Sequence, residues 1–164
     1  MTMQNTRADI GWGDLASLPE TERKAKMRAR YQELAKLNDE ERMNRMLAMA
    51  QAEYALDDAK LRSFTTSRMR VWINLDEATA KAVVAAYDQA MDKMPGAAAM
   101  RRVALVQNLA LTFPIDEQAK LRVLVPKIFA GRSDISQLVK QTATTAPQPE
   151  AEKPKKSGWG FWKK

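Results

Sequence analysis

Apolar residues recur at intervals of three and four along most of this chain, which is typical of helices that bury one face. In one stretch, for example, the stripe consists of Val83, Val84, Tyr87 and Met91. Strand-like alternation of β-branched residues is absent, and good helix formers dominate. The pattern predicts helices over residues 18–37, 39–55, 57–74, 77–94, 97–113 and 116–130.

Helix start and stop signals support these boundaries. Ser17-Leu-Pro-Glu20 has the spacing of a capping box, and Asn38-Asp-Glu-Glu41 has the same spacing. Acidic residues also stand at three later predicted starts, where the helix dipole favours negative charge: Asp57-Asp58, Asp76-Glu77 and Asp116-Glu117. Breaks are expected at Pro95-Gly96, Pro114 and Pro126, because proline cannot occupy a helix interior without cost.

The composition divides the chain into four parts. A segment over 1–16 precedes the helical region over 17–140, in which short connections predict that successive helices pack as antiparallel neighbours. Residues 141–156 contain Pro147, Pro149 and Pro154 but no large apolar side chain, and they predict a flexible, Pro/Lys-rich linker. An aromatic and basic tip follows over 157–164. The predicted fold is therefore an all-α antiparallel bundle of about six short helices with a disordered C-terminal arm.

Length and hydropathy narrow the class of protein. A chain of 164 residues fits one domain, and 45% apolar and 29% charged residues are ordinary for a globular protein. The longest apolar run, Ala82 to Tyr87, is much shorter than the roughly 18 residues of a transmembrane helix. The polar N-terminus lacks the apolar region of a secretory signal. These features predict a cytoplasmic protein, with peripheral attachment to the inner face of the membrane as an option.

The residue types present exclude many kinds of catalysis. The chain has no cysteine and no histidine, which removes thiolate nucleophiles, disulfides, the usual general base and the commonest metal ligands. Phosphate-binding and dinucleotide-binding glycine motifs are also absent. Asp88 and Asp92, four residues apart near Lys93, could hold a hard cation but are more typical of a solvated helix face. The sequence therefore predicts a non-enzymatic protein with no metal and no cofactor.

Ten methionines and several basic clusters leave two questions open. Methionine fills helical cores but also lines adaptable binding faces, so the sequence does not decide between core and interface. Arg62, Arg68 and Arg70 flank Thr65-Thr66-Ser67 and could bind phosphate or pair with Asp57, Asp58 or a neighbouring helix. A second basic run is expected to be a solvated helix surface: Arg23, Lys24, Lys26, Arg28 and Arg30.

The C-terminal tip is the strongest functional signal. Three of the chain's eleven aromatic residues, Trp159, Phe161 and Trp162, lie within its last six residues, beside Lys155, Lys156, Lys163 and Lys164. Tryptophan favours the lipid headgroup region, and each nearby lysine adds about 1 kcal/mol of attraction to an anionic surface. The same rings could instead fill pockets on a protein. Gly11-Trp12-Gly13 echoes Gly158-Trp159-Gly160, so Trp12 is either a second docking residue or packs on the bundle.

Together these features predict a non-catalytic accessory or adaptor subunit. Its arm would dock on an anionic membrane surface or on a membrane-associated protein complex. Two alternatives remain. The excess of 27 basic over 20 acidic residues suits a nucleic-acid-binding helical regulator, and the bundle also suits an assembly chaperone of a larger enzyme.

Overall fold

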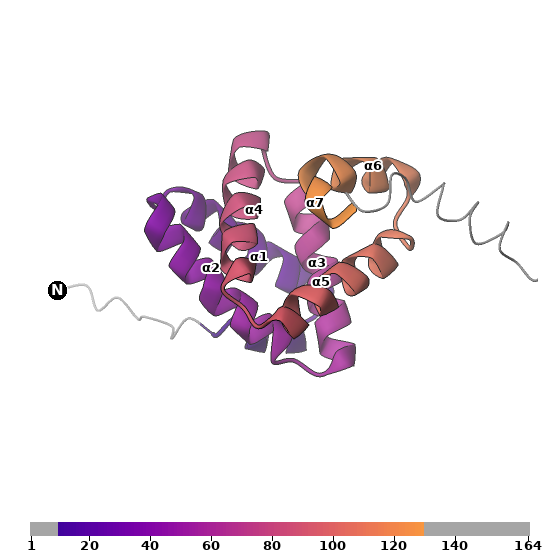
Figure 1. Ribbon diagram of the computed structural model, residues 1–164, viewed down its shortest axis with the longest axis horizontal. Helices are drawn as coiled ribbons and strands as arrows, with labels where there is room; N and C mark the ends of the chain where they lie inside the picture. Colours follow the sequence, from indigo (N-terminus) through magenta and orange to yellow (C-terminus); the bar gives the residue numbers. More distant parts are fainter. Residues whose placement is uncertain (1–9, 130–164) are drawn as a thin grey trace, which may run out of the picture. The chain divides into compact units, whose positions relative to one another are not determined.

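Helices account for almost all of the described chain. The computed structural model describes residues 10–129, and its contacts group the residues up to Ile128 into one compact unit. A short 3-10 helix, η1 (Gly13–Ser17), comes first. The α-helices that follow are α1 (Glu20–Ala35), α2 (Asp39–Tyr54), α3 (Asp58–Ile73), α4 (Glu77–Asp92), α5 (Gly96–Ala110), α6 (Ile115–Leu124) and α7 (Pro126–Phe129) (Figure 1). The predicted all-α bundle is confirmed.

Three helices begin at the polar residues that the sequence indicated. Asn38, Asp57 and Asp76 are the N-caps of α2, α3 and α4. Each side chain accepts a hydrogen bond from the backbone N–H three residues later, at 2.9, 2.9 and 3.0 Å respectively. These bonds satisfy donors that would otherwise lack a partner at a helix start.

The predicted capping box at Ser17 is wrong. Ser17 is the last residue of η1, and α1 begins three residues later with Pro19 as its N-cap and no side-chain capping bond. Helices α5 and α6 likewise follow prolines, Pro95 and Pro114. Proline suits this place because its fixed φ matches the helix and its missing N–H would have had no partner there.

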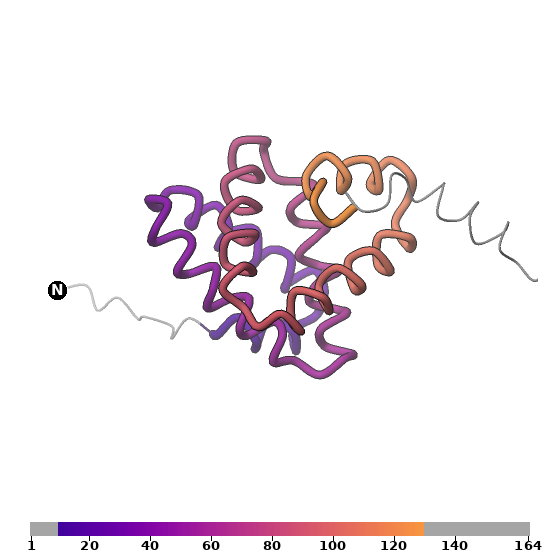
Figure 2. The backbone as a smooth tube through the Cα atoms, viewed as in Figure 1, coloured from indigo at the N-terminus to yellow at the C-terminus, as the bar shows by residue number. Residues whose placement is uncertain are grey.

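The bundle packs differently from a simple succession of antiparallel neighbours. The most extensive contacts join alternate helices, α2 with α4 and α1 with α3, whereas α1 and α2 touch only briefly. Figure 2 shows the path, with α3 and α4 running in opposite directions across a short connection. The core between these helices holds Tyr31, Phe64, Trp72 and Tyr87, each at most 1% exposed.

The methionines belong mainly to this core. Met27, Met46, Met49, Met69 and Met91 are all at most 3% exposed, whereas Met100 on α5 is 76% exposed. Most of the methionine-rich stripe is therefore packing material. The flexible side chain suits gaps between helices that cross at varied angles.

Both ends of the described region depart from the predicted helix limits. Leu15 in η1 is fully buried, and η1 contacts α1, α2 and α3, so the packed unit begins before residue 17. At the other end, α6 stops at Leu124 and α7 begins at Pro126, which confirms the expected break there. The predicted linker over 141–156 and the docking tip lie outside the described residues.

Candidate functional site

A buried polar network links three helices in the core. The carboxylate of Glu53 on α2 is fully buried and accepts three hydrogen bonds. Thr65 and Arg68 of α3 donate to one oxygen, through Oγ1 at 2.8 Å and Nε at 3.0 Å, and the Tyr87 hydroxyl of α4 donates to the other at 2.6 Å. A charged group that has left water needs such partners, and these bonds supply them.

Aromatic rings enclose the guanidinium of Arg68. Its central carbon lies 4.5 Å from the ring centres of both Trp72 and Tyr87, which adds cation–π attraction to the ion pair. Burial is the largest single influence on Arg68 and lowers its pKa. The Glu53 carboxylate, together with the hydroxyl groups of Tyr87, Tyr54 and Tyr31, outweighs burial, so the pKa of Arg68 is raised. Burial also raises the pKa of Tyr54 to about 12 and that of Tyr87 well above its ordinary value. The phenols of Tyr54 and Tyr87 are therefore neutral at neutral pH.

The three arginines around Thr65-Thr66-Ser67 do not form a phosphate site. Arg68 is 1% exposed and committed to Glu53, which removes it from the candidate docking surface. Arg70 pairs with Glu20 of α1 at 3.1 Å and lies over the ring of Phe113. Arg62 is exposed on α3. The three side chains thus have three different surroundings.

Trp12 packs on the bundle. Its indole stacks on Tyr31 with ring centres 5.5 Å apart, and the guanidinium of Arg30 lies 4.9 Å from the indole centre. Trp12 is half-buried by these contacts. An indole that already touches a phenol and a guanidinium has less free face for a docking partner.

Sequence reasoning missed the interior roles of Glu53 and Arg23. Glu53 continues the buried stripe of Met46, Met49 and Ala50, so a lone acid on an apolar face was the available signal. Arg23, expected on a solvated surface, is 7% exposed and donates through Nε to Ser67 Oγ at 2.9 Å. It also donates to carbonyls of Ala16 and Leu18 and so ties η1 to α3.

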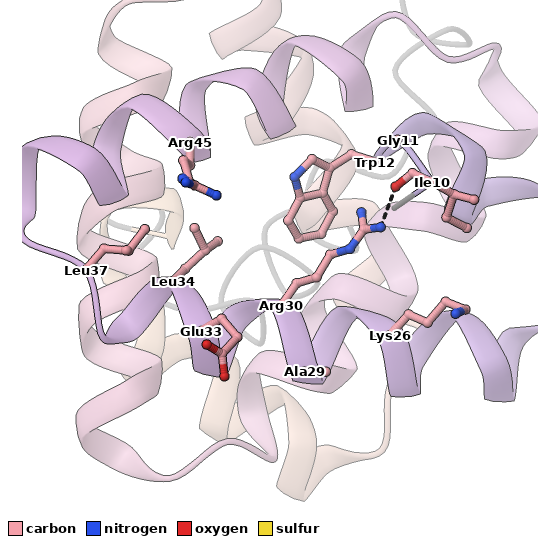
Figure 3. A pocket seen from close by; sticks show the side chains of 10 residues that line it. All are labelled: Ile10, Gly11, Trp12, Lys26, Ala29, Arg30, Glu33, Leu34, Leu37 and Arg45. Carbon is pink, nitrogen blue, oxygen red and sulfur yellow. Dashed lines mark hydrogen bonds between the residues drawn. The ribbon is translucent and has the colours of Figure 1, made fainter. Parts of the chain in front are cut away.

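One pocket opens beside Trp12 between α1 and α2 and has a volume of about 620 Å³. In Figure 3, Arg45 extends from α2 toward the indole, while Arg30 rises from α1 and donates to the carbonyl of Ile10. Lys26, Arg30 and Arg45 outnumber Glu33 around the opening, and Leu34 and Leu37 line its apolar side. The first pocket is therefore basic with an apolar wall.

A second opening, the α4–α6 groove, has a volume of about 640 Å³. Its apolar lining comes from the end of α3, the connection to α4, α4 itself and α6: Trp72, Ile73, Leu75, Ala80, Val84, Ala85, Ala119, Val123 and Leu124. Lys81, Lys120 and Lys127 stand around it together with Glu77 and Asp88. The groove lies within the size range of ligand sites, and Val123 is 83% exposed beside it.

The acidic pair on α4 is not arranged as a cation site. Asp88 accepts a 2.6 Å bond from Arg102, while Asp92 is exposed. Among residues 10–129 no group of three acidic side chains is placed to hold a metal ion. Asp88 instead joins α4 to α5 through this ion pair.

The tip residues proposed for docking lie outside the part of the chain that the structure describes: Trp159, Phe161, Trp162, Lys155, Lys156, Lys163 and Lys164. No helix within residues 10–129 is long and apolar enough to cross a membrane. No protein family, curated protein or solved structure matches the chain.

Proposed function

We propose that this protein is a non-catalytic accessory or adaptor subunit. The helical bundle is a scaffold, and the C-terminal tip attaches it to an anionic membrane face or to a membrane-associated protein complex. Trp159, Phe161 and Trp162 supply the apolar contacts, and the tail lysines supply the attraction to negative charge.

The observation that carries the proposal is the contrast between the interior and the surface. In the interior, Glu53 and Arg68 are committed to each other and to neighbouring hydroxyl groups and rings, so they serve the fold. At the surface, two openings of about 620 and 640 Å³ combine apolar walls with basic side chains. Apolar recesses with charged margins are typical of surfaces that bind other molecules. A scaffold with such recesses and an aromatic-basic tail suits an adaptor.

Attachment through the arm is tested by co-sedimentation of the full chain with anionic liposomes and with native membranes. Replacing Trp159, Phe161 and Trp162 with Ala should abolish attachment and leave thermal unfolding unchanged. The second variant replaces the five tail lysines with Gln: Lys153, Lys155, Lys156, Lys163 and Lys164. Attachment to lipid should weaken in this variant, as it should on adding salt, whereas docking in a protein pocket should change little. The matched control removes the same charge from the bundle: Lys24, Lys36, Lys60, Lys81 and Lys93 to Gln.

The comparison with a chain truncated after Lys140 decides the outcome. Loss of attachment on truncation, with the bundle-lysine control still attached, supports the proposal. If truncation changes neither membrane partition nor recovery of a protein complex, the arm is not the attachment device and the proposal fails. Sub-micromolar binding to a defined oligonucleotide at 150 mM salt would instead favour the nucleic-acid-binding regulator.

A further inference from the structure

The α4–α6 groove has apolar walls built partly from small side chains. Ala80 and Ala85 of α4 and Ala119 of α6 line it, and these short side chains leave room for a bulkier one from a partner. Val123 extends the apolar surface outward and is 83% exposed. A β-branched apolar residue this exposed beside an apolar recess offers contact area to an incoming molecule.

The groove margin has a net positive charge, because its two acidic side chains are already paired with basic residues of the bundle. Glu77 pairs with Lys81 at 2.6 Å, and Asp88 pairs with Arg102 at 2.6 Å. Within residues 10–129, Lys120 and Lys127 have no acidic partner. An occupant of the groove should therefore be apolar on one face and acidic at its margin.

We propose that the α4–α6 groove docks an acidic amphipathic helix of a partner protein. Such a helix would place apolar side chains at i, i+3/i+4 and i+7 against Val84, Ala85 and Val123 and would set its carboxylates beside Lys120 and Lys127. This inference rests on the proposed adaptor function, because it names the chemistry of the partner that the bundle holds.

Two other occupants fit less well. The chain's own tail carries five lysines against two glutamates, so its charge has the same sign as the groove margin. A fatty acid shares the required chemistry, but it favours an enclosed cavity that buries most of its surface, whereas Val123 leaves this groove open to solvent. A helix covers an open groove with one face and keeps its polar face in water.

The test uses the full chain and three labelled helical peptides, measured by fluorescence anisotropy. The peptides share one ridge of leucines and differ only in carrying Glu, Gln or Lys on the polar face. The Glu peptide should bind tightest, and its advantage over the Lys peptide should shrink at high salt. Val123→Glu should weaken its binding about tenfold or more, since an unpaired charge enters the contact. Ile115→Glu is the matched control, because Ile115 lies on the same helix, is 85% exposed and does not line the groove.

Charge reversal gives the second arm of the test. Lys120→Glu with Lys127→Glu should switch the preference to the Lys peptide, whereas Lys60→Glu with Lys93→Glu should not. The inference is overturned if no peptide binds, if Val123→Glu binds as well as the wild type, or if the Lys peptide binds as tightly as the Glu peptide. The inference is also overturned if no peptide binds but laurate does, and if Val123→Glu abolishes the binding of laurate. The groove would then be a site for an acyl anion.

The two proposals fail separately. Replacing the three tip aromatics should leave peptide binding unchanged, and Val123→Glu should leave liposome co-sedimentation unchanged. If the wild-type chain attaches to liposomes but binds no peptide, the groove proposal is wrong. If it binds the Glu peptide but does not attach to membranes, the proposal for the C-terminal arm is wrong.

Discussion

At the residue scale, the ion pair between Glu53 and Arg68 is the feature that most constrains the core. Glu53 is fully buried and Arg68 is 1% exposed, so neither charge is screened by water. The pairing distance of 3.0 Å, the hydroxyl donors and the flanking rings compensate for the lost hydration. Removing one member would leave the other charge buried without its counterion.

We predict strong coupling between these two residues. Glu53→Leu and Arg68→Met should each lower the free energy of unfolding by about 3–5 kcal/mol, because each leaves an uncompensated buried charge. The double variant should lose much less than the sum, since both charges are then gone. Urea unfolding followed by circular dichroism measures all three. The same cycle on Glu77 and Lys81, which pair at the exposed surface, should show no measurable coupling.

Additivity of the two core substitutions would contradict this account. It would mean that Glu53 and Arg68 contribute through packing alone.

The sequence could not show this pairing, because Arg68 and Glu53 lie fifteen residues apart on different helices and only tertiary packing brings them together. The sequence did place Arg68 among polar neighbours, but helix α3 turns that side of its surface toward the core.

At the scale of elements, helix starts were predictable where one side chain determines them. Asn38, Asp57 and Asp76 cap their own helices through bonds to residues three positions away, so the signal is local. The prediction at Ser17 failed because η1 occupies Gly13–Ser17, and the side chain of Arg23 donates a hydrogen bond to the carbonyl of Ala16 within it. Breaks at Pro95, Pro114 and Pro126 were predictable since the proline ring itself imposes them.

The cap at Asp76 predicts a pH dependence. Its hydrogen bonds with Thr79 hold the pKa of the carboxyl below its ordinary value of 3.8. A depressed carboxyl pKa stabilises the folded state above the unfolded-state pKa, and that contribution is lost as pH falls through the folded-state pKa. Asp76→Asn keeps an acceptor without the charge. The wild-type protein should therefore be more stable than Asp76→Asn at pH 6. The difference should shrink as the pH falls below 3.8 and vanish once the pH lies below the lowered folded-state pKa of Asp76.

Thermal unfolding at several pH values between 6 and 2.5 measures this difference. Asn38→Asp is a useful comparison, because it adds a charge at the equivalent cap of α2 and should show the opposite substitution effect. A constant difference between wild type and Asp76→Asn across this range would show that the charge of Asp76 contributes nothing to α4.

At the scale of the whole molecule, the distribution of charge matters more than its total. The net charge of +7 suggests affinity for polyanions. Yet several arginines of the bundle are already paired: Arg42 with Asp39, Arg70 with Glu20, Arg101 with Asp58 and Arg102 with Asp88. The interleaving of acids and bases is visible along the sequence, but only the folded chain shows which of them pair. Pairing leaves fewer basic groups free to neutralise phosphates.

We therefore predict weak binding of the full chain to nucleic acid. If about three phosphates are neutralised, affinity should fall roughly twentyfold between 50 and 150 mM salt. Fluorescence anisotropy with labelled single- and double-stranded oligonucleotides gives the salt slope. Replacing the five tail lysines with Gln should reduce the residual binding more than replacing five bundle lysines, because the tail has only two acids against its five lysines. Equal loss of affinity in both variants would show that the bundle also contacts the nucleic acid. Sub-micromolar affinity at 150 mM salt would favour the nucleic-acid-binding regulator over the adaptor.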